Sequence, residues 1–319
     1  MPGLLVTGGG GFVGRHLLKE LCGGAGVRVA ATVLGEVPSR ESFPAELAEV
    51  EWYAMDVCST ESIADVVRRV RPEGVFHLAG QASVGASFEA PLATWEVNAT
   101  GTVRLFSVLA REAPEVRRVV LASSAEVYGA VPEEEQPIGE SAAYQPSTPY
   151  GASKAAAEVA ALQLGGMYGI EVVVARAFNH VGPGQEERFV LPSMARQLVR
   201  IRQGGAEPIL RVGNLGVRRD FLDVRDVTRA YRTLMEQAPA GGVFNICSGV
   251  GQPLEKVIER LVELSGTGAR IEVDPARVRP ADIPVLVGDP TRLRALGWQP
   301  RIDLDRTLRD LLEDAELRA

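Results

Sequence analysis

The first half of the chain alternates short, predominantly apolar segments with longer segments of helical pattern. The apolar segments lie at residues 3–8, 27–33, 74–80, 117–124 and 170–175. Strands that are apolar on both sides must be covered on both sides, and the intervening helices supply that cover. The alternation therefore predicts an α/β fold with a Rossmann-type, doubly wound parallel sheet.

The pattern changes after about residue 177, where loops lengthen and Pro, Gly and Arg become frequent. A chain of 319 residues is also long for a single domain. We expect residues 1–177 and about 220–245 to form the Rossmann domain. Residues from about 178–219 and 246–319 would form a smaller C-terminal α/β lobe over the carboxyl ends of the strands, where open α/β sheets bind ligands.

Composition excludes several classes of partner. The formal net charge of −7 supplies no basic field, so we expect neither nucleic acid nor a membrane as partner. Cys22, Cys58 and Cys247 are far apart and lack metal-binding spacing, so we expect no metal site and buried thiols in a reducing compartment. With no apolar stretch long enough to cross a bilayer and no signal peptide, the expected location is cytoplasmic.

The stretch "VTGGGGFVGRHLL" places Gly8, Gly11 and Gly14 between the first strand and a helix. Glycines let backbone N–H groups approach a pyrophosphate, and the helix N-terminus adds partial positive charge. The plain alternative is a tight turn that happens to be rich in glycine, but its place after the first strand favours a dinucleotide. We expect Phe12 and Val13 to contact the same cofactor.

The end of the second strand leaves the choice between NADH and NADPH open. That position usually carries an acid for the ribose or an Arg for a 2′-phosphate. Here Leu34 stands there, and Glu36 and Arg40 beyond it indicate opposite choices. Asp56 after the third strand could bind the adenine amine with Val57 beside it, or could be an ordinary strand-end or capping residue.

"STPYGASKAAAE" supplies Tyr150 and Lys154, four residues apart on one helical face, with Ser147 or Thr148 as the helix cap. A nearby ammonium favours the phenolate of a tyrosine, so Lys154 would tune Tyr150 for proton transfer. "VVLASSAEVYG" places Ser123 and Ser124 at the carboxyl end of a central strand, facing the expected crevice. Ser124 could hydrogen-bond the reacting oxygen.

With these motifs the chain resembles the extended short-chain dehydrogenases/reductases that modify nucleotide sugars. Further motifs that carry the resemblance are "FHLAGQASV", "NATGT", "RDFLDVRD" and "GDPTRLRALGWQP". The resemblance implies a catalytic set of Ser124, Tyr150 and Lys154, an NAD(P) cofactor in the Rossmann domain, and a nucleoside-diphosphate sugar between the lobes. Leu78, Ala79 and Gly80 would line the nicotinamide side, and Asn98 would support the loop beneath it.

The reaction is indicated by two stretches. Many hexose 4,6-dehydratases carry an Asp-Glu pair after the site hydroxyl, whereas here Ala125 precedes Glu126. "FNHVGPGQ" and "GNLGVRRDFLDVRD" resemble the GDP-4-keto-6-deoxy-D-mannose reductases. The resemblance thus implies NADPH- or NADH-dependent reduction of a C4 ketone, with GDP-4-keto-6-deoxy-D-mannose going to GDP-D-rhamnose. Glu126 would contact a substrate hydroxyl or simply be a hydrogen-bonded acid.

The same resemblance implies substrate contacts and a homodimer. Asn179 and His180 would meet the sugar or its first phosphate, and Arg219 and Arg279 would clamp the diphosphate. His16 and His77 are expected to be structural. The helices near residues 91–111 and 149–168 form the dimer interface in related enzymes. Alternatives are a GDP-mannose 4,6-dehydratase, a 4-epimerase, or a non-catalytic Rossmann sensor, although sensors commonly lack the Tyr/Lys pair.

Overall fold

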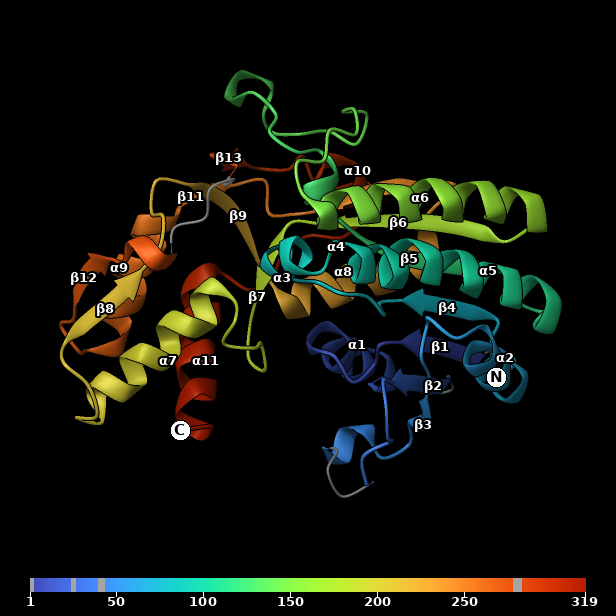
Figure 1. Cartoon of the computed structure of the whole chain (residues 1–319), viewed down its shortest axis with the longest axis horizontal. Coiled ribbons are helices and arrows are strands. Elements are labelled where there is room, and N and C mark those ends of the chain that lie inside the picture. The colour runs from blue at the N-terminus through green and yellow to red at the C-terminus, as the bar shows by residue number, and fades with distance from the viewer. Residues whose placement is uncertain (1–2, 24–26, 40–43, 278–282) are drawn as a thin grey trace.

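The structure, a computed structural model, describes residues 3–23, 27–39, 44–277 and 283–319. A seven-stranded parallel sheet forms its larger part (Figure 1). The strand order is β10-β6-β5-β4-β1-β2-β3, which is a doubly wound order with one strand added beyond β6 and agrees with the predicted fold class. The strands are β1 (Gly3–Thr7), β2 (Arg28–Val33), β3 (Glu51–Ala54), β4 (Gly74–His77), β5 (Arg118–Ser124), β6 (Glu171–Ala177) and β10 (Val243–Ile246).

Successive residues of each central strand pack into two separate cores. Val119 of β5 lies in one core with α2, α5 and α6, whereas Val120 lies in the other with α1 and α8. This alternation is the reason that the strands are apolar throughout. The covering helices are α1 (Phe12–Cys22), α2 (Thr60–Val70), α5 (Gly101–Glu112), α6 (Pro149–Tyr168) and α8 (Val224–Gln237).

The helix expected at residues 91–111 is interrupted by a π-helical turn. It divides into α4 (Pro91–Trp95), the π-helix η3 (Glu96–Thr100) and α5. Within η3, Asn98 is buried, and its amide exchanges two hydrogen bonds with the backbone of Gln81, of 2.9 and 3.1 Å. The wider turn therefore supports the loop after β4.

The smaller lobe has its own core. It is built by α7 (Val190–Arg202), α9 (Leu254–Ser265) and α11 (Leu304–Leu317), with the strand pair β8 (Ile209–Val212) and β12 (Arg270–Val273). A second sheet contains β7 (Asn179–Val181), β9 (Arg218–Asp223), β11 (Gly251–Pro253) and β13 (Val285–Leu286). Short elements complete the fold: α3 (Val84–Glu89), α10 (Thr291–Arg294) and the 3₁₀-helices η2 (Ala45–Leu47), η4 (Ala125–Val127), η5 (Glu133–Glu135) and η6 (Pro275–Arg277).

The motif "RDFLDVRD" connects the two lobes. Its helical part, α8, packs on the main sheet, whereas β9 pairs with β7, β11 and β13 of the second sheet. Three buried aspartates of the motif hold other parts of the chain. Asp220 accepts from the N–H groups of residues 248 and 249, Asp223 from the hydroxyl of residue 307, and Asp226 from the N–H groups of residues 301 and 302. Each aspartate therefore holds a different downstream segment.

Within the described ranges, no helix combines the length and the apolar character that crossing a bilayer requires. The domain boundaries expected near residues 177, 220 and 245 stay a prediction.

Candidate active site

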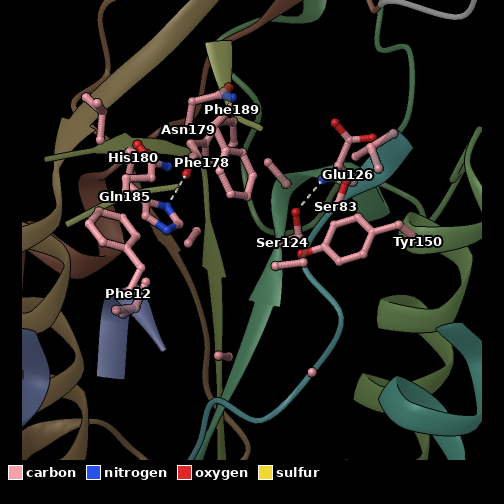
Figure 2. Close-up of a pocket in the computed structure, with 18 of the residues that line it drawn as sticks. Phe12, Ser83, Ser124, Glu126, Tyr150, Phe178, Asn179, His180, Gln185 and Phe189 are labelled. Carbon is pink, nitrogen blue, oxygen red and sulfur yellow. Dashed lines mark hydrogen bonds between the residues drawn. The ribbon is translucent and has the colours of Figure 1, made fainter. Parts of the chain in front are cut away.

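A cavity of about 790 Å³ lies at the carboxyl ends of the central strands, where the chain order reverses between β1 and β4. The glycine turn, the ends of β4 and β5, the start of α6 and the segment 177–192 line it. Figure 2 shows Phe12, His180 and Gln185 on one side of this pocket, with Ser124, Glu126 and Tyr150 on the other.

The glycine turn has the geometry of a pyrophosphate cradle. Gly8 has a φ of +71°, and a Cβ there would lie 2.8 Å from the backbone N of Ala79. A Cβ on Gly14 would lie 2.5 Å from the carbonyl oxygen of Gly8. Only a glycine at position 14 therefore lets the turn approach α1 this closely. Gly11 caps α1 without a side-chain bond, and the first turn holds no acid. The N–H groups of that turn therefore suit an anion.

A chain of oriented hydrogen bonds fixes the loop after β4. The N–H of Ala79 donates to Thr7 Oγ1 at 3.1 Å, and Thr7 lies 2.8 Å from His77 Nδ1. His77 Nε2 lies 3.2 Å from Thr102, which donates onward to the carbonyl of Asn98 at 2.7 Å. Because Thr102 gives its one proton to Asn98, Nε2 of His77 must carry a proton. Burial lowers the pKa of His77 to about 3, so the ring is neutral and Nδ1 accepts from Thr7, as a structural role requires.

Ser124 and Tyr150 meet where β5 and α6 converge. Thr148 caps α6 by accepting from the N–H of Gly151 at 2.9 Å. A Cβ on Gly151 would lie 2.5 Å from the carbonyl oxygen of Glu126, so glycine permits α6 to pack on η4. The hydroxyl of Ser124 then hydrogen-bonds Tyr150, and it accepts from the N–H of Glu126 at 3.2 Å.

Burial shifts the pKa values of Tyr150 and Lys154 in opposite directions. Burial raises the pKa of Tyr150 to about 12, and the hydrogen bond with Ser124 only opposes this shift. Burial also lowers the pKa of Lys154 to about 8. The Lys154 ammonium donates to the carbonyl of Ala122 at 2.9 Å. In the protein alone burial therefore outweighs the effects that favour the Tyr150 phenolate, and the tuning of Tyr150 by Lys154 stays a prediction.

The two strand-end serines have separate surroundings. Both line the cavity, in agreement with their expected place at the crevice, and the Ser123 hydroxyl also donates to the buried carboxylate of Glu158. The Ser123 hydroxyl therefore has a structural partner, Glu158, whereas the Ser124 hydroxyl hydrogen-bonds Tyr150. Glu126 also lines the cavity, and its charge contributes to raising the pKa of Tyr150.

Beneath these residues lies a buried ion pair. Arg176 of β6 holds Glu158 of α6 through a contact of 2.8 Å, and their side chains are 3% and 0% exposed. The guanidinium lies 4.8 Å from the ring centres of both Tyr128 and Tyr144. Tyr144 donates to Glu158 at 2.7 Å, which completes the shell of the carboxylate.

The expected substrate residues that the structure describes all line the cavity, namely Ser124, Glu126, Asn179, His180 and Arg219. Arg279 lies outside the described residues, as does Arg40. Glu36 and Leu34 are both exposed.

Asp56 and Val57 lie beyond the carboxyl end of β3 and do not line the cavity. One oxygen of Asp56 accepts from the N–H of Cys58 at 2.8 Å, as the structural alternative expects, while the exposed side chain still permits an adenine contact. The adenine contact therefore stays a prediction.

Sequence reasoning did not select several lining residues, including Ser83, Phe88, Gln185, Phe189 and Tyr231. The segment "GPGQ" was a signal for Gln185, because it continues directly from Asn179 and His180. The others are ordinary helix and loop residues in the sequence, and only the fold brings them to the cavity.

Comparisons with known proteins extend over nearly the whole chain. A family model described as GDP-mannose 4,6 dehydratase matches residues 5–311. The GDP-6-deoxy-D-mannose reductase of Pseudomonas aeruginosa is 39% identical over 316 residues, covering 99% of this chain and 97% of that protein.

Solved structures agree in fold. The structure of RMD from Pseudomonas aeruginosa complexed with NADPH has a TM-score of 0.87 and 38% identity, with 100% of both chains covered. The UDP-glucose 4-epimerase of Thermus thermophilus in complex with NAD has a TM-score of 0.86 and 31% identity, with 98% of both chains covered.

The buried ion pair predicts a large, site-specific loss of stability. Arg176→Met should lower the free energy of unfolding by about 3–5 kcal/mol, because it leaves the Glu158 carboxylate buried without its partner. The matched control is Arg68→Met, which removes a pair with Asp65 whose side chains are 53% and 57% exposed, and it should cost at most about 1 kcal/mol. Urea unfolding followed by circular dichroism measures both, and equal losses would contradict the role given to the buried pair.

Proposed function

Because the chain belongs to the GDP-mannose 4,6-dehydratase family of short-chain dehydrogenases/reductases, we propose that it is an NAD(P)H-dependent oxidoreductase that reduces the C4 ketone of a nucleotide-linked 4-keto-6-deoxyhexose. One observation carries the proposal: the hydrogen-bonded hydroxyls of Ser124 and Tyr150 lie in the same cavity as the glycine turn. A proton donor and a dinucleotide cradle at one site suit the reduction of a carbonyl group.

The proposed substrate is GDP-4-keto-6-deoxy-D-mannose, and the product is GDP-D-rhamnose. The 39% identity to a GDP-6-deoxy-D-mannose reductase supports this choice. Ala125 supports it as well, because the position after Ser124 lacks the first acid of the Asp-Glu pair found in many dehydratases. The preference for GDP over other nucleotides is part of the proposal.

The cofactor is NADPH or NADH, and the residues of the glycine turn fit its pyrophosphate. Gly8, Gly11, Phe12, Val13 and Gly14 would hold the phosphates against the N-terminus of α1. Leu78, Ala79 and Gly80 would lie at the nicotinamide end, on the loop that the His77 chain fixes. When bound, the reduced nicotinamide supplies a hydride to the ketone carbon.

The protein's own residues handle the proton. Tyr150, protonated because its pKa is about 12, gives its phenolic proton to the C4 oxygen as that oxygen gains charge. Ser124 hydrogen-bonds the same oxygen, and the charged Lys154 stabilises the phenolate that remains and holds the cofactor ribose. Glu126 would contact a sugar hydroxyl. Asn179 and His180 stand where the sugar would enter, and Arg219 and Arg279 would hold the diphosphate.

The main alternative is dehydration or epimerisation by the same residues. The description of the matching family and the presence of Glu126 in the cavity favour testing a GDP-mannose 4,6-dehydratase first. Incubation of GDP-mannose with the protein and oxidised cofactor distinguishes them. A dehydratase forms the 4-keto sugar without net cofactor consumption, whereas a reductase consumes one reduced cofactor for each keto sugar supplied.

Tyr150→Phe tests the proposed reduction directly. With GDP-4-keto-6-deoxy-D-mannose and NADPH, kcat should fall by about 100-fold or more, because the general acid is lost. Tyr53→Phe is the matched control, since the Tyr53 hydroxyl donates to Glu51 of the same strand, β3, and lies outside the cavity. The rate is followed by NADPH absorbance, with dTDP- and UDP-linked keto sugars compared in the same assay. An unchanged kcat for Tyr150→Phe would refute the mechanism.

The pKa of Lys154 predicts a pH dependence of cofactor binding. Its ammonium is charged below about pH 8, so its contribution to NADPH affinity is present below that pH and is lost as the pH rises through about 8. Fluorescence titration of NADPH between about pH 6.5 and 9.5 should show the Kd rising across this range. Lys154→Met should bind more weakly and lose the dependence. If Lys154→Met kept the same pH dependence of the NADPH Kd, that dependence would have to come from another titratable group.

We also propose a homodimer in the cytoplasm. Large apolar side chains are exposed on α4 and α6, including Leu92 at 85% and Val159 at 56%. Exposed apolar patches on an isolated chain are typical of surfaces that bind another protein chain. In analytical ultracentrifugation the protein should sediment as a dimer, and Leu92→Glu with Val159→Glu should yield monomers. Val273→Glu, at an equally exposed residue of β12, should leave the dimer intact. A monomeric wild-type protein would refute this proposal.

A further inference from the structure

Tyr231 of α8 is a buried tyrosine whose hydroxyl has no partner among the residues that the structure describes. It is 2% exposed, and it lines the cavity. Other tyrosines bond a side chain through the hydroxyl, as do Tyr53, Tyr128, Tyr144 and Tyr150. The hydroxyl of Tyr231 therefore differs from these in taking no part in the hydrogen bonds of the fold.

The direction of α8 brings this hydroxyl to the carboxyl edge of the main sheet. The helix leads into β10, which runs parallel to β6, so α8 begins at the carboxyl edge and ends at the amino edge. In agreement, Arg118 at the amino end of β5 donates to the carbonyl of Met235 at 2.9 Å. Long side chains on a helix lean toward its N-terminus. The ring of Tyr231 therefore rises through the core, and its hydroxyl is the end that reaches the cavity.

Tyr231 lies between two parts of the cavity wall. α8 packs against α1, whose first turn belongs to the glycine cradle, and against β5 and β6, which end at Ser124 and Ala177. A dinucleotide with its phosphates at the cradle and its nicotinamide beside Tyr150 has to cross the space between these walls. Its adenosine half extends the other way, toward the end of β2. Tyr231 is therefore placed beneath the nicotinamide mononucleotide half.

The hydroxyl of Tyr231 keeps its proton and can donate it to a hydrogen bond. Burial raises the pKa of Tyr231, and the charge of an ionised Tyr150 raises it further. The second effect also indicates that the two phenols are near neighbours. A neutral phenol suits the carboxamide, ribose and phosphate oxygens of a nicotinamide mononucleotide, all of which accept hydrogen bonds.

Tyr128 provides the contrast within the same chain. It is 1% exposed and does not line the cavity, and its hydroxyl lies 2.7 Å from Asn245 Oδ1 and 2.9 Å from Arg176. Tyr231 is as deeply buried, yet phenylalanine would fill its place without leaving a polar atom unbonded, which is a destabilising feature in a core. The hydroxyl of Tyr128 serves the fold, whereas that of Tyr231 is open to a ligand.

We propose that Tyr231 is a ligand-binding residue whose hydroxyl donates a hydrogen bond to the nicotinamide mononucleotide half of the bound dinucleotide. The proposal rests on the proposed function in that it takes a nicotinamide dinucleotide as the ligand. It adds a contact from α8, a helix that carries neither the glycine turn nor the Ser/Tyr/Lys set.

Titration calorimetry of Tyr231→Phe tests the proposal with ligands that contain or lack the nicotinamide half. NADPH contains it, 2′,5′-ADP is the adenosine half alone, and GDP-mannose represents the nucleotide sugar. The Kd of NADPH should rise about fivefold, the size of effect expected from one lost hydrogen bond. The Kd values of 2′,5′-ADP and GDP-mannose should stay the same. The urea midpoint of the unliganded variant should not fall, because no bond of the fold is removed.

The matched control is Tyr128→Phe, which removes a hydroxyl that the fold uses. It should lower the urea midpoint and leave the ratio of NADPH to 2′,5′-ADP affinity near the wild-type value. An unchanged NADPH Kd in Tyr231→Phe would overturn the proposal, and so would an equal rise in the Kd of 2′,5′-ADP. A loss of affinity accompanied by a lower urea midpoint would also overturn it, since that result indicates a structural hydroxyl. Binding is measured without turnover, so failure of the reductase assay alone would refute the proposed function and not this contact.

Discussion

At the edge of the main sheet that borders the cavity, the structure depends on the buried ion pair between Arg176 and Glu158. A charge pair without solvent is stable only when nearly every donor and acceptor around it is satisfied. Ser123 and Tyr144 donate to Glu158, and Tyr128 bonds Arg176 and Asn245. Ser123 belongs to β5, Arg176 to β6, Asn245 to β10 and Glu158 to α6, and the two tyrosines lie on the segment between η4 and α6. The pair therefore fixes the relative position of the elements that present Ser124 and Lys154.

This arrangement explains how one short stretch can serve both stability and chemistry. Ser123 and Ser124 are adjacent on β5, but alternate residues of a strand point to opposite sides. Ser123 is hydrogen-bonded to Glu158, and Ser124 is hydrogen-bonded to Tyr150. Glu158 is one helical turn beyond Lys154, and its charge opposes the loss of the Lys154 proton that burial favours. The framework thus helps to set the charge of a proposed ligand-binding group.

The cavity has two sides of different chemistry. The side formed by β5 and α6 presents a phenol and a hydroxyl, which can give protons. The side formed by Phe12, His180 and Gln185 presents aromatic surface, with the rings of Phe12 and His180 stacked at 6.2 Å between centres. A ligand that spans the cavity would have to match both sides at once, and this is a stricter requirement than either set of residues imposes alone.

Much of this was predictable from sequence because it depends on local pattern. The period of apolar residues determined the parallel sheet and its two layers of helices, and the spacing of Gly8, Gly11 and Gly14 and of Tyr150 and Lys154 determined a turn and a helical face. Tertiary structure decided what depends on desolvation and on contacts between distant segments. Tertiary contacts set the pKa values of Tyr150 and Lys154, the hydrogen bond of Ser123 to Glu158 and the pairing of β9 outside the main sheet. The reason is that burial and hydrogen-bond partners exist only after the chain has folded.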